Sequence, residues 1–221
     1  MEQSNRVRML AYLVIALAAL IAASNALWYL SYRNLSAEYN NERLALENVT
    51  ARLIYAGKLL NVSIKTIQAY RNLTALLNTT LTAVEAGKIA AVTNVSLELD
   101  VESIKLMALA TNAISEANQT TDPVAREYLV MVVLNATNAT MEGLKALAFL
   151  GSYMGANTTY FQYIASAEKS VQEVASLAFQ LRSPSTTVSA DSVTSNLTAF
   201  VSNVLAAERI LASLAHPLST S

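Results

Sequence analysis

The chain has 221 residues, of which 53% are hydrophobic and only 14% are charged, with 15 basic against 16 acidic side chains. It has no cysteine, so the composition excludes disulfide scaffolds, thiolate zinc sites, iron–sulfur clusters and cysteine nucleophiles. The balanced charge removes the electrostatic argument for nucleic-acid binding. Because 37 alanines and 32 leucines stand against five glycines and three prolines, we predict an all-α fold.

The amino-terminal part combines basic residues with a long charge-free segment. Residues 1–8 carry Arg6 and Arg8, and residues 9–30 contain no charge. A helix of that length is roughly 33 Å long at ~1.5 Å per residue, which matches a hydrocarbon core. We predict a transmembrane signal-anchor helix over residues 9–30 in the cell membrane. Residues 1–8 would be cytoplasmic because basic residues precede the span, and the rest would be extracellular. Aromatic residues near both ends of the span resemble an interfacial belt: Tyr12, Trp28, Tyr29 and Tyr32.

Two alternatives to the anchor stay open. Ser24 and Ala26 are the small residues that a signal peptidase favours, so residues 1–26 could be a cleaved signal peptide. The anchor better explains the full 22-residue length and the aromatic residues beyond Ala26. In the second alternative, the segment is a buried helix of a soluble core. A cleaved signal peptide, like the anchor, would still place the bulk of the chain outside the cell.

Glycosylation sequons, Asn-x-Ser/Thr, are the strongest signal in the sequence. With 17 asparagines and 40 serines and threonines in 221 residues, chance would give about 3 such triplets. There are eleven, all of them after the charge-free span, and we predict that they carry N-linked glycans. Alternatively, these asparagines replace charges on a polar surface or serve in turns and caps. The predicted sites are Asn34, Asn48, Asn61, Asn72, Asn78, Asn94, Asn118, Asn135, Asn138, Asn157 and Asn196. Asn34 is the weakest of them because it lies close to the span.

A coiled-coil-like heptad pattern follows the predicted span. With Glu42 as the one exception, apolar residues recur at steps of four and three, and the pattern extends through Ile67 and Tyr70 to Val84. When this stripe is labelled a and d, the sequons fall at outward positions (b, c, e and f). The stripe begins with Leu35, Tyr39, Glu42, Leu46, Val49, Leu53, Ala56 and Leu60.

Together with this stripe, residues 31–215 are predicted to form one extracellular, antiparallel helical bundle with short loops. Gly57 and Gly87 suggest breaks, and the polar stretch 93–100 predicts a connection, with a possible strand at 96–101, before a helix from Val101. Asp122 followed by Pro123 predicts a helix start, and that helix should end near residue 150. Its apolar run, residues 128–134, predicts burial on all sides.

Two further stripes at helical spacing predict the last helices, the first ending before Pro184 and the second capped by Ser189. Residues 216–221 should form a flexible tail. The stripes are Tyr160, Ile164, Ala167, Val171, Val174, Ala178 and Leu181, then Val193, Leu197, Phe200, Val204, Ala207, Leu211 and Leu214.

Catalytic and metal-binding patterns are scarce. Glu98, Asp100 and Glu102 would share one face of a strand and could hold Ca²⁺, but a solvated helix start explains them better. His216, in the tail, lacks metal-binding partners in the sequence. We find no nucleophile, phosphate-loop or dinucleotide motif, so we expect no enzyme activity, cofactor or metal site.

These features predict a membrane-anchored, N-glycosylated cell-surface protein, such as an envelope stalk, coat component or accessory subunit. Its partners would be the membrane, its glycans and other envelope proteins, with no nucleic acid. Residues 95–117 and 158–195 contain no sequon, so the helix over residues 160–181 should face the bundle core or another subunit. The alternatives are a ligand-binding sensory ectodomain and a subunit of an extracellular filament. The composition is similar to that of surface proteins of extremophilic archaea.

Overall fold

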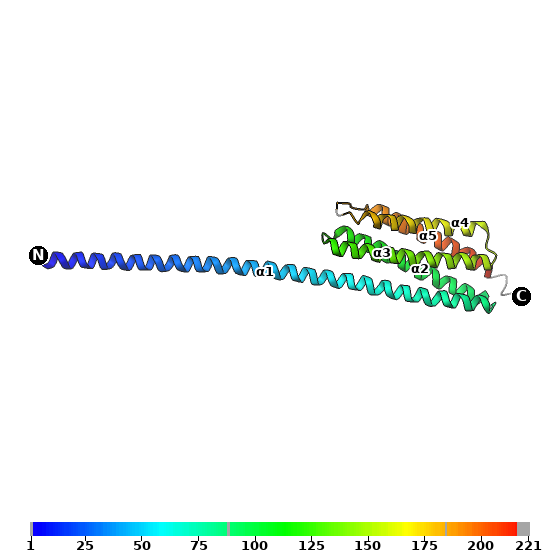
Figure 1. Cartoon of the computed structure of the whole chain (residues 1–221), viewed down its shortest axis with the longest axis horizontal. Coiled ribbons are helices and arrows are strands. Elements are labelled where there is room, and N and C mark those ends of the chain that lie inside the picture. The colour runs from blue at the N-terminus through cyan, green and yellow to red at the C-terminus, as the bar shows by residue number, and fades with distance from the viewer. Residues whose placement is uncertain (1, 88, 184, 216–221) are drawn as a thin grey trace. The chain divides into compact units, whose positions relative to one another are not determined.

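The computed structural model describes residues 2–87, 89–183 and 185–215, with side chains from residue 23 onward. Over these residues the chain is all-helical, with no strand, which confirms the predicted fold class. The helices are α1 (Glu2–Glu85), α2 (Ile89–Gln119), α3 (Pro123–Tyr153), α4 (Thr158–Gln180) and α5 (Ala190–Ala215) (Figure 1). By its contacts the chain divides into two compact units between Ala56 and Gly57, so that α1 contributes to both.

The first unit consists of the amino-terminal part of α1. Every side chain described from residue 23 to Ala56 is exposed, apart from the half-buried Tyr55. This part of the helix therefore presents its apolar residues to solvent, Leu46 and Leu53 among them.

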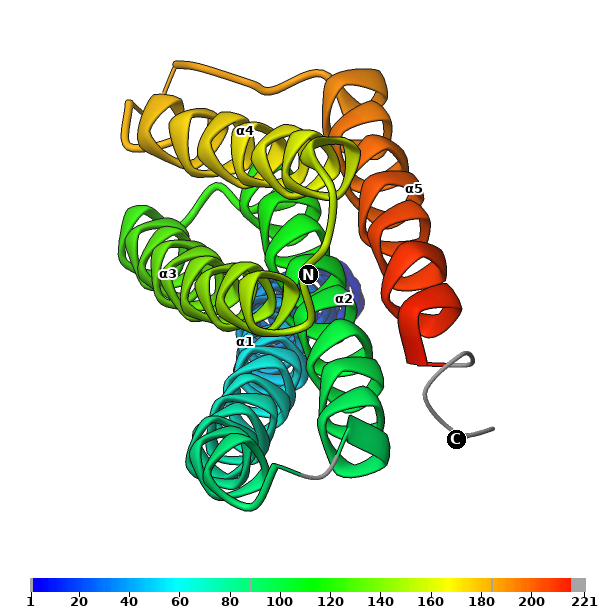
Figure 2. The same ribbon diagram turned by 90° about the vertical axis from the view of Figure 1, so that its right-hand side faces the viewer.

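The second unit is a helical bundle in which α2 occupies the centre. Figure 2 shows α3, α4, α5 and the last part of α1 arranged around it. Helix α2 buries residues on several sides, including Val92, Leu99 and Met107. Burial of a Leu, Val or Met side chain contributes about 1.5–3 kcal/mol, so this core is the main source of bundle stability. Alanine is common in the core and allows the helices to pack closely.

The helix ends follow local sequence signals. Gly87 (φ 64°) ends α1 and Gly155 (φ 72°) lies in the turn after α3, in a backbone conformation that glycine adopts without strain. Asp122 caps α3 as predicted: its carboxylate accepts a hydrogen bond from the Val124 N–H at 3.0 Å, and Pro123 begins the helix.

Gly143 and Gly151 lie inside α3, where they permit close contact with neighbouring helices. A Cβ atom on Gly151 would lie 2.1 Å from Cε1 of Tyr160, and one on Gly143 would lie 2.4 Å from Oγ of Ser103. Helix α3 ends at Tyr153, close to the predicted end near residue 150. Gly151 leaves room for the Tyr160 ring.

Three local predictions are wrong. Helix α1 runs through Gly57 without a break. The polar stretch 93–100 belongs to α2, so neither the connection nor the possible strand at 96–101 exists. Within the run 128–134, Tyr128 and Met131 are 45% and 44% exposed, so that run is not buried on all sides.

The extension of the heptad stripe beyond Leu60 is also wrong. Ile67 and Tyr70 are exposed, whereas Ala69 and Leu73 are buried, so the buried face of α1 is displaced from the predicted stripe. The buried residues Thr66, Ala69, Leu73, Thr80 and Ala83 recur with the same heptad spacing, but each lies one position before the predicted stripe.

The stripes of the last two helices agree better with the prediction. All seven stripe residues from Tyr160 to Leu181 are buried, and in α5 only Leu197 and Leu214 are partly exposed. The predicted helix over residues 160–181 therefore faces the core of its own bundle.

Candidate functional site

The predicted membrane span is helical, since α1 runs from Glu2 through residues 9–30. The structure does not describe the side chains of residues 9–22, so the predicted interfacial residue Tyr12 lies outside the described part. The predicted tail, residues 216–221 with His216, also lies outside the described residues. At the other end of the span Trp28, Tyr29 and Tyr32 are 75%, 66% and 64% exposed. Exposed aromatic side chains at this end of an apolar helix suit a membrane–water interface.

A second segment meets the criteria for a membrane span by length and composition. Among the residues with described side chains, α5 (Ala190–Ala215) is the one helix that is long and apolar enough. The sequence pattern predicted this helix as part of the bundle and not as a span. In the bundle its apolar stripe, which includes Phe200 and Val204, is buried, while Asp191 and Arg209 lie on its exposed side. This amphipathic arrangement is that of a bundle helix.

The sequon asparagines all avoid the core. Nine of the eleven are exposed, and Asn118 and Asn196 are half-buried. A glycan is bulky and hydrated, so it requires such outward positions. The exposed asparagines are Asn34, Asn48, Asn61, Asn72, Asn78, Asn94, Asn135, Asn138 and Asn157.

Two sequon asparagines have structural roles that the sequon pattern does not reveal. Asn157 caps α4, where its Oδ1 accepts a hydrogen bond from the Tyr160 N–H at 3.1 Å, and its Nδ2 stays available for a sugar. Asn118 instead uses both ends of its amide: Nδ2 donates to the Val188 carbonyl at 2.8 Å and Oδ1 accepts from the Val188 N–H at 3.0 Å. It thereby fixes the segment between α4 and α5 to the end of α2.

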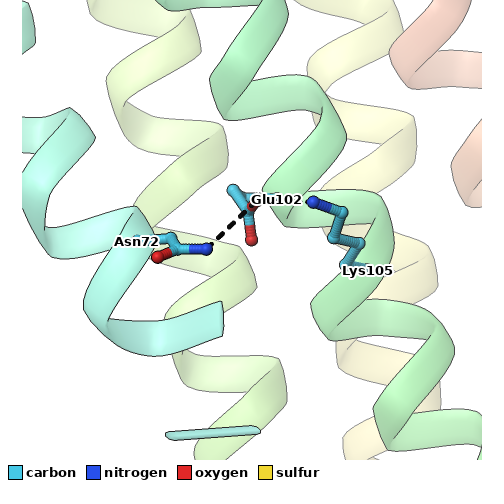
Figure 3. A network of polar contacts seen from close by, with 3 residues as sticks. All are labelled: Asn72, Glu102 and Lys105. Carbon is cyan, nitrogen blue, oxygen red and sulfur yellow. Dashed lines mark hydrogen bonds and ion pairs between the residues drawn. The ribbon is translucent and has the colours of Figure 1, made fainter. Parts of the chain in front are cut away.

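The three alternating acidic residues do not form a cluster. On the helix, Asp100 lies on a different side from Glu98 and Glu102, and the described residues contain no group of three or more acidic or histidine side chains that could hold a metal ion. Glu102, with its side chain 10% exposed, receives hydrogen bonds from Lys105 at 2.7 Å and from Asn72 at 3.5 Å (Figure 3). The strand arrangement considered for Ca²⁺ is therefore wrong.

Asp100 is the most unusual ionisable group in the bundle. It is 4% exposed, and its Oδ2 atom has no hydrogen-bond partner among the described residues. Burial, followed by the charge of Glu208 on α5, raises the pKa of Asp100 from 3.8 to about 8. Burial and then the charge of Asp100 raise the pKa of Tyr160, whose hydroxyl donates to the Leu147 carbonyl at 2.6 Å. A neutral Asp100 is thus part of the folded core near neutral pH.

An open groove of about 1010 Å³ lies between α1 and α3, with Leu106 of α2 among its lining residues. Ile67 and Tyr70 of α1 and Tyr128 and Met131 of α3 provide its exposed apolar and aromatic surface. The hydroxyl groups of Ser63 and Tyr128 contact each other and connect the two helices. The groove suits an apolar or amphipathic ligand. Three sequon asparagines also line it: Asn78, Asn135 and Asn138.

The sequence did not indicate this groove because its residues come from segments about 60 positions apart, and because the predicted stripe assigned Ile67 and Tyr70 to a buried face. The same holds for the surroundings of Asp100, which depend on how α2 meets α5. Comparisons with protein-family models, with characterised proteins and with solved structures found no match. The functional argument therefore rests on the residues and geometry described above.

Proposed function

We propose that the protein is a membrane-anchored, heavily N-glycosylated structural or interaction protein of the cell surface. Residues 9–30 hold it in the cell membrane with the amino terminus inside, and the antiparallel bundle lies outside the cell. The protein acts as an envelope stalk, coat component or accessory subunit, by composition an archaeal one. It binds other envelope proteins and performs no chemical reaction.

The distribution of the sequons carries this proposal. Eleven sequons follow the charge-free segment, and none of their asparagines lies in the core. A segment with basic residues before it and aromatic residues at its far end supports the same orientation independently. The two arguments use different residues and agree.

Contacts with envelope partners should use surfaces that lack glycans. The stripe from Tyr160 to Leu181 is occupied within the bundle, so a partner on this helix would contact its outer residues, such as Phe161 and Phe179, which are 37% and 51% exposed.

The intact mass of the protein from its native membrane, before and after chemical deglycosylation, tests the proposal. We expect a mass well above 23.7 kDa that falls to the full-length value when the glycans are removed. Loss of residues 1–26 would show a cleaved signal peptide and contradict the anchor. An unmodified mass would contradict the glycoprotein.

The groove between α1 and α3 favours a second candidate function, a ligand-binding ectodomain. A ligand that binds the folded bundle at 100 times its Kd should stabilise it by about 2.7 kcal/mol. Thermal unfolding in the presence of candidate amphiphiles would measure this effect. The stabilisation should disappear in Ile67→Arg, which places a charge in the groove, and should persist in Ile54→Arg, an exposed position outside it.

A further inference from the structure

The amino-terminal part of α1 carries a long apolar face that none of the described residues covers. We call this face the amino-terminal stripe: Leu35, Tyr39, Glu42, Leu46, Val49, Leu53 and Ala56. Its large apolar members are between 53% and 68% exposed. So many exposed apolar side chains in one line exceed what a solvated helix normally presents.

The spacing of the stripe identifies the kind of surface that covers it. Its residues recur at alternating steps of four and three, which is the 3.5-residue repeat of helices that wind around one another. In this register the d positions are Leu35, Glu42, Val49 and Ala56, and the a positions are Tyr39, Leu46 and Leu53. A lipid surface requires no such repeat, whereas a second helix in knobs-into-holes packing does.

Charges beside the stripe indicate that the second helix belongs to another copy of this chain. Glu38 occupies a g position and Arg43 the following e position, the pair that faces across two parallel helices in register. Two copies would therefore form the attractive contacts Glu38–Arg43 and Arg43–Glu38. Within one chain Arg43 lies 3.4 Å from Glu47, and both side chains are more than 60% exposed, so the guanidinium is accessible to a partner.

The sequons leave this face free. Asn34 and Asn48 both fall at c positions, outside the a and d positions. Glycans on them would project away from the partner and would cover the outer surface of the pair.

We propose that copies of this chain associate in parallel through the amino-terminal stripe as a coiled coil. The association rests on the stripe itself, while the parallel direction also rests on the proposed function, because copies anchored in one membrane point the same way. Glu42, facing its counterpart at a d position, fixes the register at a cost in stability, as polar residues in such seams do.

The absence of cysteine allows a direct test on the full-length protein in detergent. Single variants Tyr39→Cys, Leu46→Cys and Leu53→Cys should each give covalent dimers with a short bismaleimide at dilute protein concentration. The matched control is Leu44→Cys, since Leu44 is also exposed (56%) but lies at an f position. We expect at least ten-fold more dimer from each stripe variant than from the control.

Several results would overturn the proposal. Equal cross-linking of Leu46→Cys and Leu44→Cys would indicate random collision, and cross-linking at only one of the three stripe positions would indicate an antiparallel pair. A monomeric protein mass by light scattering, after subtraction of the detergent, would exclude association. None of these results would alter the native mass that tests the proposed function, so the two can fail separately.

A second pair of variants tests the seam without relying on the reagent. In the Leu46→Cys background, Leu53→Asn should reduce dimer formation at least ten-fold, while Ile54→Asn, at the adjacent b position, should leave it unchanged. Glu38→Arg should weaken association by placing like charges together, and Glu38→Arg with Arg43→Glu should restore it. An equal effect of Leu53→Asn and Ile54→Asn would refute the assignment of the seam.

Discussion

Asn118 and Val188, which are 70 residues apart, are joined by two hydrogen bonds between the side-chain amide and the backbone. The two bonds lie on one edge of the amide, so the Nδ2 hydrogen in use is the one on the same side as Oδ1. An N-linked sugar takes that same position when the amide is trans, as a peptide bond is. The native pairing and a glycan therefore compete for one site.

We accordingly predict that Asn118 is less occupied than the exposed sequon asparagines of the bundle. Site-resolved mass spectrometry of native glycopeptides would measure occupancy at each asparagine. Occupancy of Asn118 equal to that of the exposed Asn138 would contradict the prediction.

Removal of the Asn118 amide should also destabilise the bundle. Asn118→Ala leaves the Val188 N–H and carbonyl without partners, which costs about 1–3 kcal/mol. Denaturant unfolding of unglycosylated protein would measure the loss. Asn94→Ala is the control, because Asn94 is an exposed sequon residue of the same helix, and we expect a change below about 0.5 kcal/mol there.

Gly151→Ala should destabilise the bundle because the added Cβ atom would overlap the Tyr160 ring, 2.1 Å from its Cε1 atom. Overpacking of this kind costs about 1–3 kcal/mol. Gly57→Ala should have the opposite effect: no atom lies within 4 Å of its Cβ position, and alanine in a helix interior is more favourable by roughly 0.5–1 kcal/mol. The midpoint temperature of thermal unfolding should thus fall in Gly151→Ala and rise in Gly57→Ala.

The double variant Gly151→Ala with Tyr160→Leu checks the cause. Since the smaller side chain removes the overlap, the stability loss in the double variant should be smaller than the sum of the losses in the two single variants. Strict additivity would show that Gly151 is required for another reason.

How far the sequence predicts the structure depends on where each helix packs. The stripe from Tyr160 to Leu181 was identified correctly because one face of α4 meets one core. In α1 the exposed Ile67 and buried Leu73 were assigned the wrong way round, since the heptad repeat and the bundle contact use different faces. Gly57 and Gly87 look alike in sequence, yet only Gly87 has a positive φ. Gly57 lies inside α1, whereas Gly87 follows its last residue, where the chain turns toward α2.

The candidate sites also differ in whether local sequence or contacts between distant segments determine them. Asn34 and Asn48 are exposed, as their outward heptad positions predict. The pairing of Asn118 with Val188 depends instead on a contact between segments 70 residues apart. Asp100 resembled a solvated acid among Glu98 and Glu102. Its burial depends on where α5 crosses α2, and no local pattern encodes that crossing.

The stability of the bundle should decrease as pH rises from about 4 to 8. The pKa of Asp100 is raised from 3.8 to about 8 in the folded state, so the folded protein holds this proton more tightly than the unfolded chain. The stabilisation that comes from the Asp100 proton is complete below pH 3.8 and is lost as the pH approaches 8. The full shift corresponds to roughly 6 kcal/mol as an upper limit. Denaturant unfolding at several pH values would measure the trend.

Asp100→Asn should remove most of this dependence, because a neutral amide replaces the buried carboxyl group that titrates. The variant should be more stable than the parent protein at pH 8 and similar to it at pH 4. Glu98→Gln, on an exposed carboxyl group two residues away, should leave the profile unchanged. Equal effects of the two variants would assign the pH dependence to net charge instead of Asp100.

Trp28 offers a direct test of the anchor because it is the only tryptophan in the chain. If residues 9–30 span the membrane, its indole lies at the interface, where the N–H is hydrated and the ring contacts lipid. In vesicles we expect a blue-shifted emission that brominated lipids quench. Lipids brominated near the headgroup should quench more strongly than lipids brominated at the chain ends.

Trp28→Phe combined with Leu44→Trp moves the fluorophore 16 residues along the helix, about 24 Å further from the membrane. Quenching should then disappear, and equal quenching at both positions would mean that the helix lies along the membrane surface instead of crossing it.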